Sequence, residues 1–127
     1  MKKYISLFLF SVIFASCVTA QNVGLTQKER ENWNTPPDLT KVIFEGGDGK
    51  SVENAIIIKD AENERNGIAA EYDYISKKHG VKFVDWKPVG TSTFDEKSKK
   101  YDAINVQTIQ KNETITFYFD ITEFYGK

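Results

Sequence analysis

The chain offers few side chains for nucleophilic or metal chemistry. His79 is the only histidine and Cys17 the only cysteine among its 127 residues. A catalytic triad needs an imidazole beside a Ser or Cys nucleophile, and a structural zinc site needs four Cys or His ligands. His79 instead follows Lys77 and Lys78 at the end of a predicted helix, where cations interact favourably with the helix dipole. We therefore interpret His79 as structural and expect neither a metal ion nor a cofactor.

Carboxylates are plentiful, but their spacing does not assemble an acid–base pair. Glu71 and Asp73 lie two residues apart on the predicted helix. They therefore point to different faces, which is typical of solvated charges. Acids from distant segments, such as Asp85 and Asp120, could meet in the fold, although nothing singles them out. We predict no catalytic residue, and an enzyme that uses carboxylates from several strands stays as the alternative.

A glycine-rich stretch at 45–54 imitates two ligand-binding loops. Residues 49–51 (GKS) match the end of a P-loop, but Phe44 stands where that motif needs its first glycine. A calcium loop that starts at Asp48 would place Lys50 at its third position and Glu53 at its sixth. Both patterns fail, so we predict an ordinary turn.

Aromatic side chains are the remaining candidates for recognition. Most must form the core, but Tyr74 and Tyr118 fall on faces opposite the apolar ones of their elements. Exposed Tyr and Trp residues are typical anchors of binding surfaces. We predict that Tyr74, Trp86 and Tyr118 form a contact patch.

The elements that position these residues follow from residue periodicity. Asn63 is a plausible N-cap for a helix that runs to His79 and stops at Gly80, with one face made by Ile68, Tyr72, Ile75 and His79. Apolar alternation predicts five strands, at about 42–44, 55–59, 82–94, 101–109 and 114–121. The prediction is an α+β fold of order β-β-α-β-β-β, in which one main helix packs on one face of an antiparallel sheet.

Composition indicates one small globular domain without disulfides. Hydrophobic residues make up 40% of the chain and charged residues 28%, as in globular domains and unlike disordered tails. The formal net charge is −1. It becomes −3 if the first twenty residues, with Lys2 and Lys3, are removed. An acidic domain lacks the electrostatic footprint for phosphate backbones, so we expect no nucleic-acid partner.

The first twenty residues have the pattern of a secretion signal. Lys2 and Lys3 precede an apolar run at 5–15, which is too short for a transmembrane helix. Two cleavage hypotheses compete. Cleavage after Ala20 would release a soluble protein into the periplasm or the medium, whereas lipidation of Cys17 would anchor it to a membrane. The expected organisation is a signal at 1–20, a polar tether at 21–40 and a single domain at 41–127.

Four segments (GGDGKSVENAIIIK, NGIAAEYDYISKKHG, YDAINV and YFDITEFYGK) together resemble a group of small exported proteins of Bacteroidota with no assigned activity. The resemblance spans residues 42–127. It implies a shared fold and an envelope or secreted location, and it transfers no functional residue.

We expect a small exported protein that acts as a non-enzymatic binding or inhibitor module for a protein or glycan of the envelope. Small size, an export signal, missing catalytic motifs and surplus aromatics motivate this expectation. The alternatives are a small hydrolase or transferase with strand-borne carboxylates, and a structural surface lipoprotein.

Overall fold

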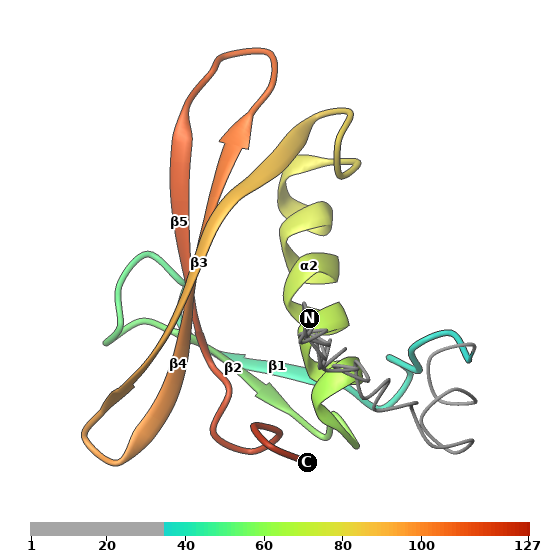
Figure 1. Ribbon diagram of the computed structural model, residues 1–127, viewed down its shortest axis with the longest axis vertical. Helices are drawn as coiled ribbons and strands as arrows, with labels where there is room; N and C mark the ends of the chain where they lie inside the picture. Colours follow the sequence, from blue (N-terminus) through green and yellow to red (C-terminus); the bar gives the residue numbers. More distant parts are fainter. Residues whose placement is uncertain (1–34) are drawn as a thin grey trace, which may run out of the picture. The chain divides into compact units, whose positions relative to one another are not determined.

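One helix lies against one face of a five-stranded sheet in the computed structural model, which describes residues 35–127 (Figure 1). Residues Pro36–Lys127 form one compact unit. In chain order its elements are β1 (Ile43–Gly46), β2 (Ile56–Lys59), α2 (Glu64–His79), β3 (Trp86–Glu96), β4 (Lys99–Thr108) and β5 (Thr114–Asp120). The α+β class and the predicted order of elements are confirmed.

The sheet is mixed, which corrects the prediction of a purely antiparallel one. Its strand order is β1-β2-β5-β4-β3, and β2 pairs with β5 in parallel while the other three pairs are antiparallel. The parallel pair arises because α2 carries the chain from β2 across the sheet to its far edge. The meander β3-β4-β5 then returns and places β5 beside β2.

The β3–β4 hairpin is longer and tighter than predicted. Residues 95–100 were expected to connect two strands, but β3 runs to Glu96 and β4 begins at Lys99. The turn consists of Lys97 and Ser98, both with positive φ (48° and 64°), as in the type I′ turns that match strand twist. The start of β3 was placed too early, because residues 81–85 form a turn before Trp86.

The ends of α2 are confirmed, and its predicted buried face is confirmed in part: Ile75 is buried in the core and Tyr72 packs against it, but Ile68 does not. Asn63 caps the helix by accepting a hydrogen bond from the Asn66 backbone N–H, and Gly80 (φ 98°) ends it. Ile68 is 43% exposed, whereas Gly67 and Ala70 face the core. A Cβ at Gly67 would lie 2.4 Å from the Phe124 ring, so the helix approaches the C-terminal segment through its smallest residues. Close approach at Gly67 therefore selects the face together with the apolar side chain of Ile75.

The core fills the space between α2 and the sheet, and the C-terminal segment closes it at one end. Tyr74 packs on an aromatic layer with Phe44, Phe117 and Phe119. The chain end runs under the start of α2, where the Glu64 N–H donates to the Lys127 carbonyl (Figure 1). Within the described part of the chain, no helix is long and apolar enough to cross a membrane.

Candidate functional site: an acid pocket

Two carboxyl side chains meet inside the domain, in a small pocket that we call the acid pocket. The helix α2, the strands β3 and β4 and the C-terminal segment all contribute to its walls. Its lining residues are Glu64, Ile68, Glu71, Tyr72, Thr91, Thr93, Asp102, Ile104, Ile121, Phe124 and Tyr125.

Strand register places Asp102 and Thr93 side by side. The two residues are directly paired across β3 and β4, so their side chains point to the same face of the sheet. This is the face under α2, because Ile104 and Val106 alternate with Asp102 along β4 and are buried there. The Thr93 hydroxyl donates a hydrogen bond of 2.5 Å to Asp102 Oδ1. Asp102 is therefore fixed in a largely buried position, 8% exposed.

Glu71 approaches Asp102 from the helix. It is 1% exposed, because it follows Ala70 on the side of α2 that presses on the sheet. Burial raises the pKa of Glu71 most, and the charge of Asp102 and a hydrogen bond shared with Asp102 add to the effect, so that the pKa rises from 4.5 to about 9. At neutral pH Glu71 is therefore protonated and donates to Asp102.

The pair is not fully satisfied. Glu71 Oε2 is buried and has no hydrogen-bond partner among the described residues. A buried polar group without a partner costs about 1–3 kcal/mol relative to a satisfied one. Neither a helix nor a sheet needs a carboxyl group at this position, and an apolar side chain would fill it without that cost. Glu71 and Asp102 both line the acid pocket, so a group bound there would lie beside these two carboxyls.

The pocket is small and its walls are mostly apolar. Its volume is about 200 Å³. That volume is below the roughly 300–1,000 Å³ of sites for drug-sized ligands. Ile68 and Tyr125, 43% and 47% exposed, lie toward the mouth, while Ile121 and Phe124 are buried. Such a pocket admits the end of one side chain or a small amine, and not a polymer.

The structure does not bring Tyr74, Trp86 and Tyr118 together on one surface. Trp86 is fully buried, stacks on Tyr72 with 6.3 Å between ring centroids and donates from Nε1 to the Gly80 carbonyl. Tyr74 is a half-buried residue of α2 whose ring packs toward the sheet, on Phe44 and Phe119. Tyr118 lies on the opposite face of the sheet, where it contacts Phe94.

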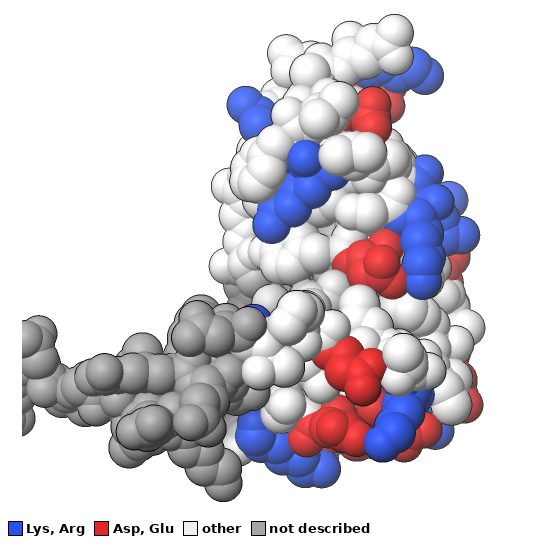
Figure 2. Space-filling view, turned by 90° about the vertical axis from the view of Figure 1, so that its right-hand side faces the viewer, with Lys and Arg blue, Asp and Glu red and all other residues white. Residues whose placement is uncertain are grey.

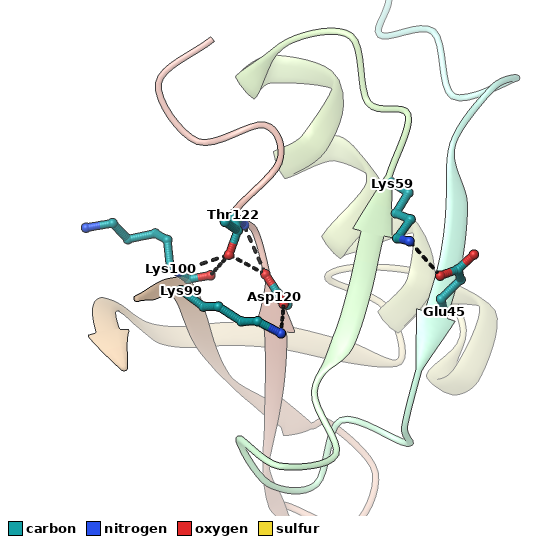
Figure 3. A network of polar contacts seen from close by, with 6 residues as sticks. All are labelled: Glu45, Lys59, Lys99, Lys100, Asp120 and Thr122. Atoms are coloured by element: carbon teal, nitrogen blue, oxygen red, sulfur yellow. Dashed lines mark hydrogen bonds and ion pairs between the residues drawn. The ribbon is translucent and has the colours of Figure 1, made fainter. Parts of the chain in front are cut away.

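The distant acids Asp85 and Asp120 hold local structure at different places. Asp85 Oδ2 accepts a hydrogen bond of 2.7 Å from the Val81 N–H. Asp120 accepts from the Thr122 hydroxyl at 2.6 Å and lies 3.8 Å from Lys99 Nζ (Figure 3).

A separate ion pair, Lys59–Glu45 at 3.0 Å, links β1 and β2 in the same view (Figure 3). The contacts of Asp85, Asp120 and the Lys59–Glu45 pair leave no buried side-chain oxygen or nitrogen without a partner. We therefore place no site at these residues.

The acid pocket is not apparent from the sequence, because Glu71 and its helical neighbour Asp73 point to different faces and Asp102 lies on a distant strand. The useful signal was the pair of small residues Gly67 and Ala70, which marks the side of α2 that approaches other elements and therefore carries Glu71 inward. Asp102 could have been placed from its alternation with Ile104 and Val106.

The remaining predictions concern the N-terminal segments and a metal site. Cys17, the signal at 1–20 and most of the tether lie outside the described residues, whereas 36–40 belong to the compact unit. Among residues 35–127, no cluster of three or more His, Cys, Asp or Glu could hold a metal ion. No protein-family model, curated protein or solved structure matches the chain.

Proposed function

We propose that the chain is an exported, non-enzymatic binding module whose acid pocket receives a primary ammonium group, such as the end of a lysine side chain on a partner protein. The unpartnered buried oxygen of Glu71 beside Asp102 is the observation that carries this proposal.

The chemistry of the lining suits an alkyl ammonium group. An ammonium has three donors and no acceptor, and the carboxyl groups of Glu71 and Asp102 both line the pocket. The methylene stem would lie against Ile68, Ile121 and the ring of Tyr125 near the mouth. A bound cation would also favour the ionised form of Glu71, because an opposite charge in a buried site lowers the pKa of a carboxyl.

Binding should therefore release a proton. In the free protein Glu71 is protonated at neutral pH, and in the complex it is ionised next to the ammonium, so up to one proton passes to the solvent. Affinity should rise with pH toward the pKa of the amine. The other titratable groups of the lining are Glu64, Tyr72, Asp102 and Tyr125, and Lys100 Nζ lies 4.5 Å from the Tyr125 ring.

The test is calorimetric titration of the full chain with butylammonium, which mimics a lysine side chain, and with butanol as the uncharged control. We expect a dissociation constant on the order of 1 mM for the amine, because a ligand of so few atoms gains about 4 kcal/mol. Repeating the titration in buffers of different ionisation enthalpy measures the released proton. A peptide that contains lysine then distinguishes a side chain from a free amine.

Glu71→Gln and Glu53→Gln form a matched pair of variants. Glu71→Gln retains a donor for Asp102 but cannot become anionic, so it should abolish amine binding while the protein stays folded. Glu53 is exposed in the 47–54 loop, and its substitution should leave binding unchanged. Equal binding by wild type and Glu71→Gln would contradict the proposal.

The alternative, a small hydrolase with two catalytic carboxyls, is favoured by the same Glu71–Asp102 pair. Glycosidases separate their carboxyls by about 5–9.5 Å, whereas these two share a hydrogen bond. Aspartic proteases share one proton between two carboxyls, but they do so in a cleft that admits a peptide, and this pocket holds about 200 Å³. Hydrolysis of a glycan or peptide that Glu71→Gln abolishes would establish the alternative.

Export and anchoring rest on the first twenty residues. Intact mass of the mature protein from membrane and soluble fractions decides between the two cleavage hypotheses. A species that begins at Cys17 with added acyl mass would be a surface lipoprotein, and one that begins at Gln21 would be free in the periplasm or the medium.

A further inference from the structure

The end of the domain at which α2 finishes exposes apolar side chains on a single turn. Val81, Phe83 and Val84 are 61%, 68% and 65% exposed, in the connection between α2 and β3. The β4–β5 hairpin (109–113) lies at the same end, with Ile109 45% exposed (Figure 1). We call residues 81–84 and 109–111 the apical surface.

The turn is held rigidly in this exposed conformation. The Val81 carbonyl accepts from the N–H groups of Val84 (3.1 Å) and Asp85 (2.8 Å), and the Ile109 N–H donates to the Asp85 carbonyl, which ties the hairpin to the turn. Phe83 has φ 66°, a left-handed conformation that is rare for an aromatic residue. The fold thus maintains a strained residue whose large apolar side chain stays mostly exposed.

Charge is distributed unevenly between this end and the rest of the domain. Residues 77–87 contain four lysines and one aspartate, and residues 109–113 contain Lys111 and Glu113, which gives a formal charge of +3. The other residues from 35 to 127 carry eight Lys or Arg and fourteen Asp or Glu, a formal charge of −6. Figure 2 shows that most acidic side chains on the face it presents lie in the middle and lower parts, whereas basic side chains are found at all heights.

Lys82 lies within the apolar turn itself. Its Nζ is 4.1 Å from the centroid of the Tyr72 ring and 5.2 Å from that of Phe83. In the described part of the chain neither Lys82 nor Lys111 forms an ion pair. Lysines that flank exposed aromatic and aliphatic side chains are the combination that binds anionic membrane surfaces.

We propose that the apical surface docks on an anionic phospholipid bilayer, with Val81, Phe83 and Val84 entering the boundary between headgroups and acyl chains. Lys82 and Lys111 then face the anionic headgroups. A fluid lipid surface accommodates a protruding turn of any shape, whereas a protein partner would need a pocket complementary to it. This inference is independent of the acid pocket, because the two sites share no residue and touch through the contact of Lys82 with Tyr72, which lines the pocket.

The test is hydrogen exchange of the full chain with phosphatidylglycerol vesicles and with phosphatidylcholine vesicles. Lys2 and Lys3, which precede the apolar run at 5–15, can also favour anionic vesicles, so the readout is local protection at the apical surface and not total binding. We expect slower exchange at 81–85 and 109–113 with the anionic vesicles only, and little change at the β3–β4 turn.

Two variants separate the apolar and the charged contributions. Phe83→Gly removes the exposed ring at a position whose φ suits glycine, so the fold is retained and the added protection at 109–113 should be lost. The double change Lys82→Glu and Lys111→Glu should reduce binding about tenfold or more. Lys50→Glu with Lys97→Glu, at two exposed lysines outside the apical surface, is the matched control.

Three results would overturn the proposal. The first is equal protection by anionic and neutral vesicles, and the second is protection that Phe83→Gly retains. The third is protection of 81–85 by soluble polyglutamate without protection by vesicles, which would identify an acidic protein as the partner.

Discussion

The acid pocket buries carboxyl side chains, which are usually exposed, whereas the apical surface exposes large apolar side chains, which are usually buried. The pocket encloses Glu71 and Asp102, 1% and 8% exposed, whereas the apical surface exposes Phe83 at 68%. Burying an unsatisfied carboxyl lowers the stability of the folded state. Exposing an apolar side chain costs little, because the unfolded chain exposes it too. Changes in the pocket should therefore alter stability, and changes at the surface should alter association while changing stability by no more than about 1 kcal/mol.

The largest expected effect on stability comes from comparing Trp86, in the core, with Val81, in the exposed turn that precedes it. Trp86 is fully buried under Tyr72 and bonded to Gly80, so Trp86→Ala should lower the free energy of unfolding by about 3–5 kcal/mol. Val81→Ala, at a side chain 61% exposed, should change it by less than about 0.5 kcal/mol. Urea denaturation of both variants measures the contrast, and equal losses would show that the turn is part of the core.

The next effect is a pH dependence that belongs to the acid pocket. The pKa of Glu71 rises from 4.5 in the unfolded chain to about 9 in the folded protein, so between these values the folded state holds a proton that the unfolded state has lost. Stability should therefore fall as pH rises through this window, by at most about 1.4 kcal/mol per pH unit. Below pH 4.5 both states are protonated and the penalty is absent.

Glu71→Gln removes this titration. Its free energy of unfolding should be nearly flat over the same window and should exceed that of the wild type at the alkaline end. Thermal denaturation at a series of pH values provides the comparison. Parallel profiles for the two proteins would mean that Glu71 ionises in the folded state as it does in water.

The smallest expected effects concern backbone strain. Ser98 and Phe83 have nearly the same φ, 64° and 66°, but Ser98 sits in a plain hairpin turn. Glycine at either position relieves the backbone strain of the folded state, which stabilises it, but also increases the entropy of the unfolded chain, which offsets part of the gain. The free energy of unfolding should therefore rise by about 0–1 kcal/mol. Only Phe83→Gly should also lose vesicle binding. A loss of stability specific to Phe83→Gly would show that the ring packs within the domain.

Residue patterns local in the sequence predicted the helix and the strands, whereas strand pairing and the buried face of the helix depend on tertiary contacts. Asn63 and Gly80 bound the helix as expected because caps depend on neighbouring backbone groups. The parallel pairing of β2 with β5 could not be deduced, since it depends on where the meander returns. Apolar periodicity places Ile75 of α2 in the core correctly but also places Ile68 there, because it gives no weight to the small residue Gly67, whose close approach to Phe124 decides the packing at that end.

The site was harder to predict than the fold. Glu71 and Asp102 come from a helix and a strand, and each resembles a solvated charge when it is compared only with its neighbours in sequence. For Trp86 the sequence supports two interpretations, a core residue or a binding residue, because large aromatic residues dominate both cores and interfaces. Its hydrogen bond to Gly80 inside the domain resolves the two interpretations.

The central claim is that Glu71 is a protonated, buried carboxyl that ionises when an ammonium group occupies the acid pocket. Carbon-13 NMR of the Glu71 side-chain carboxyl at neutral pH, with and without butylammonium, tests it directly. The account predicts the chemical shift of a protonated acid in the free protein and that of a carboxylate in the complex, with Glu53 unchanged. A carboxylate shift in the free protein, or a protonated one that saturating amine leaves unaltered, would contradict it.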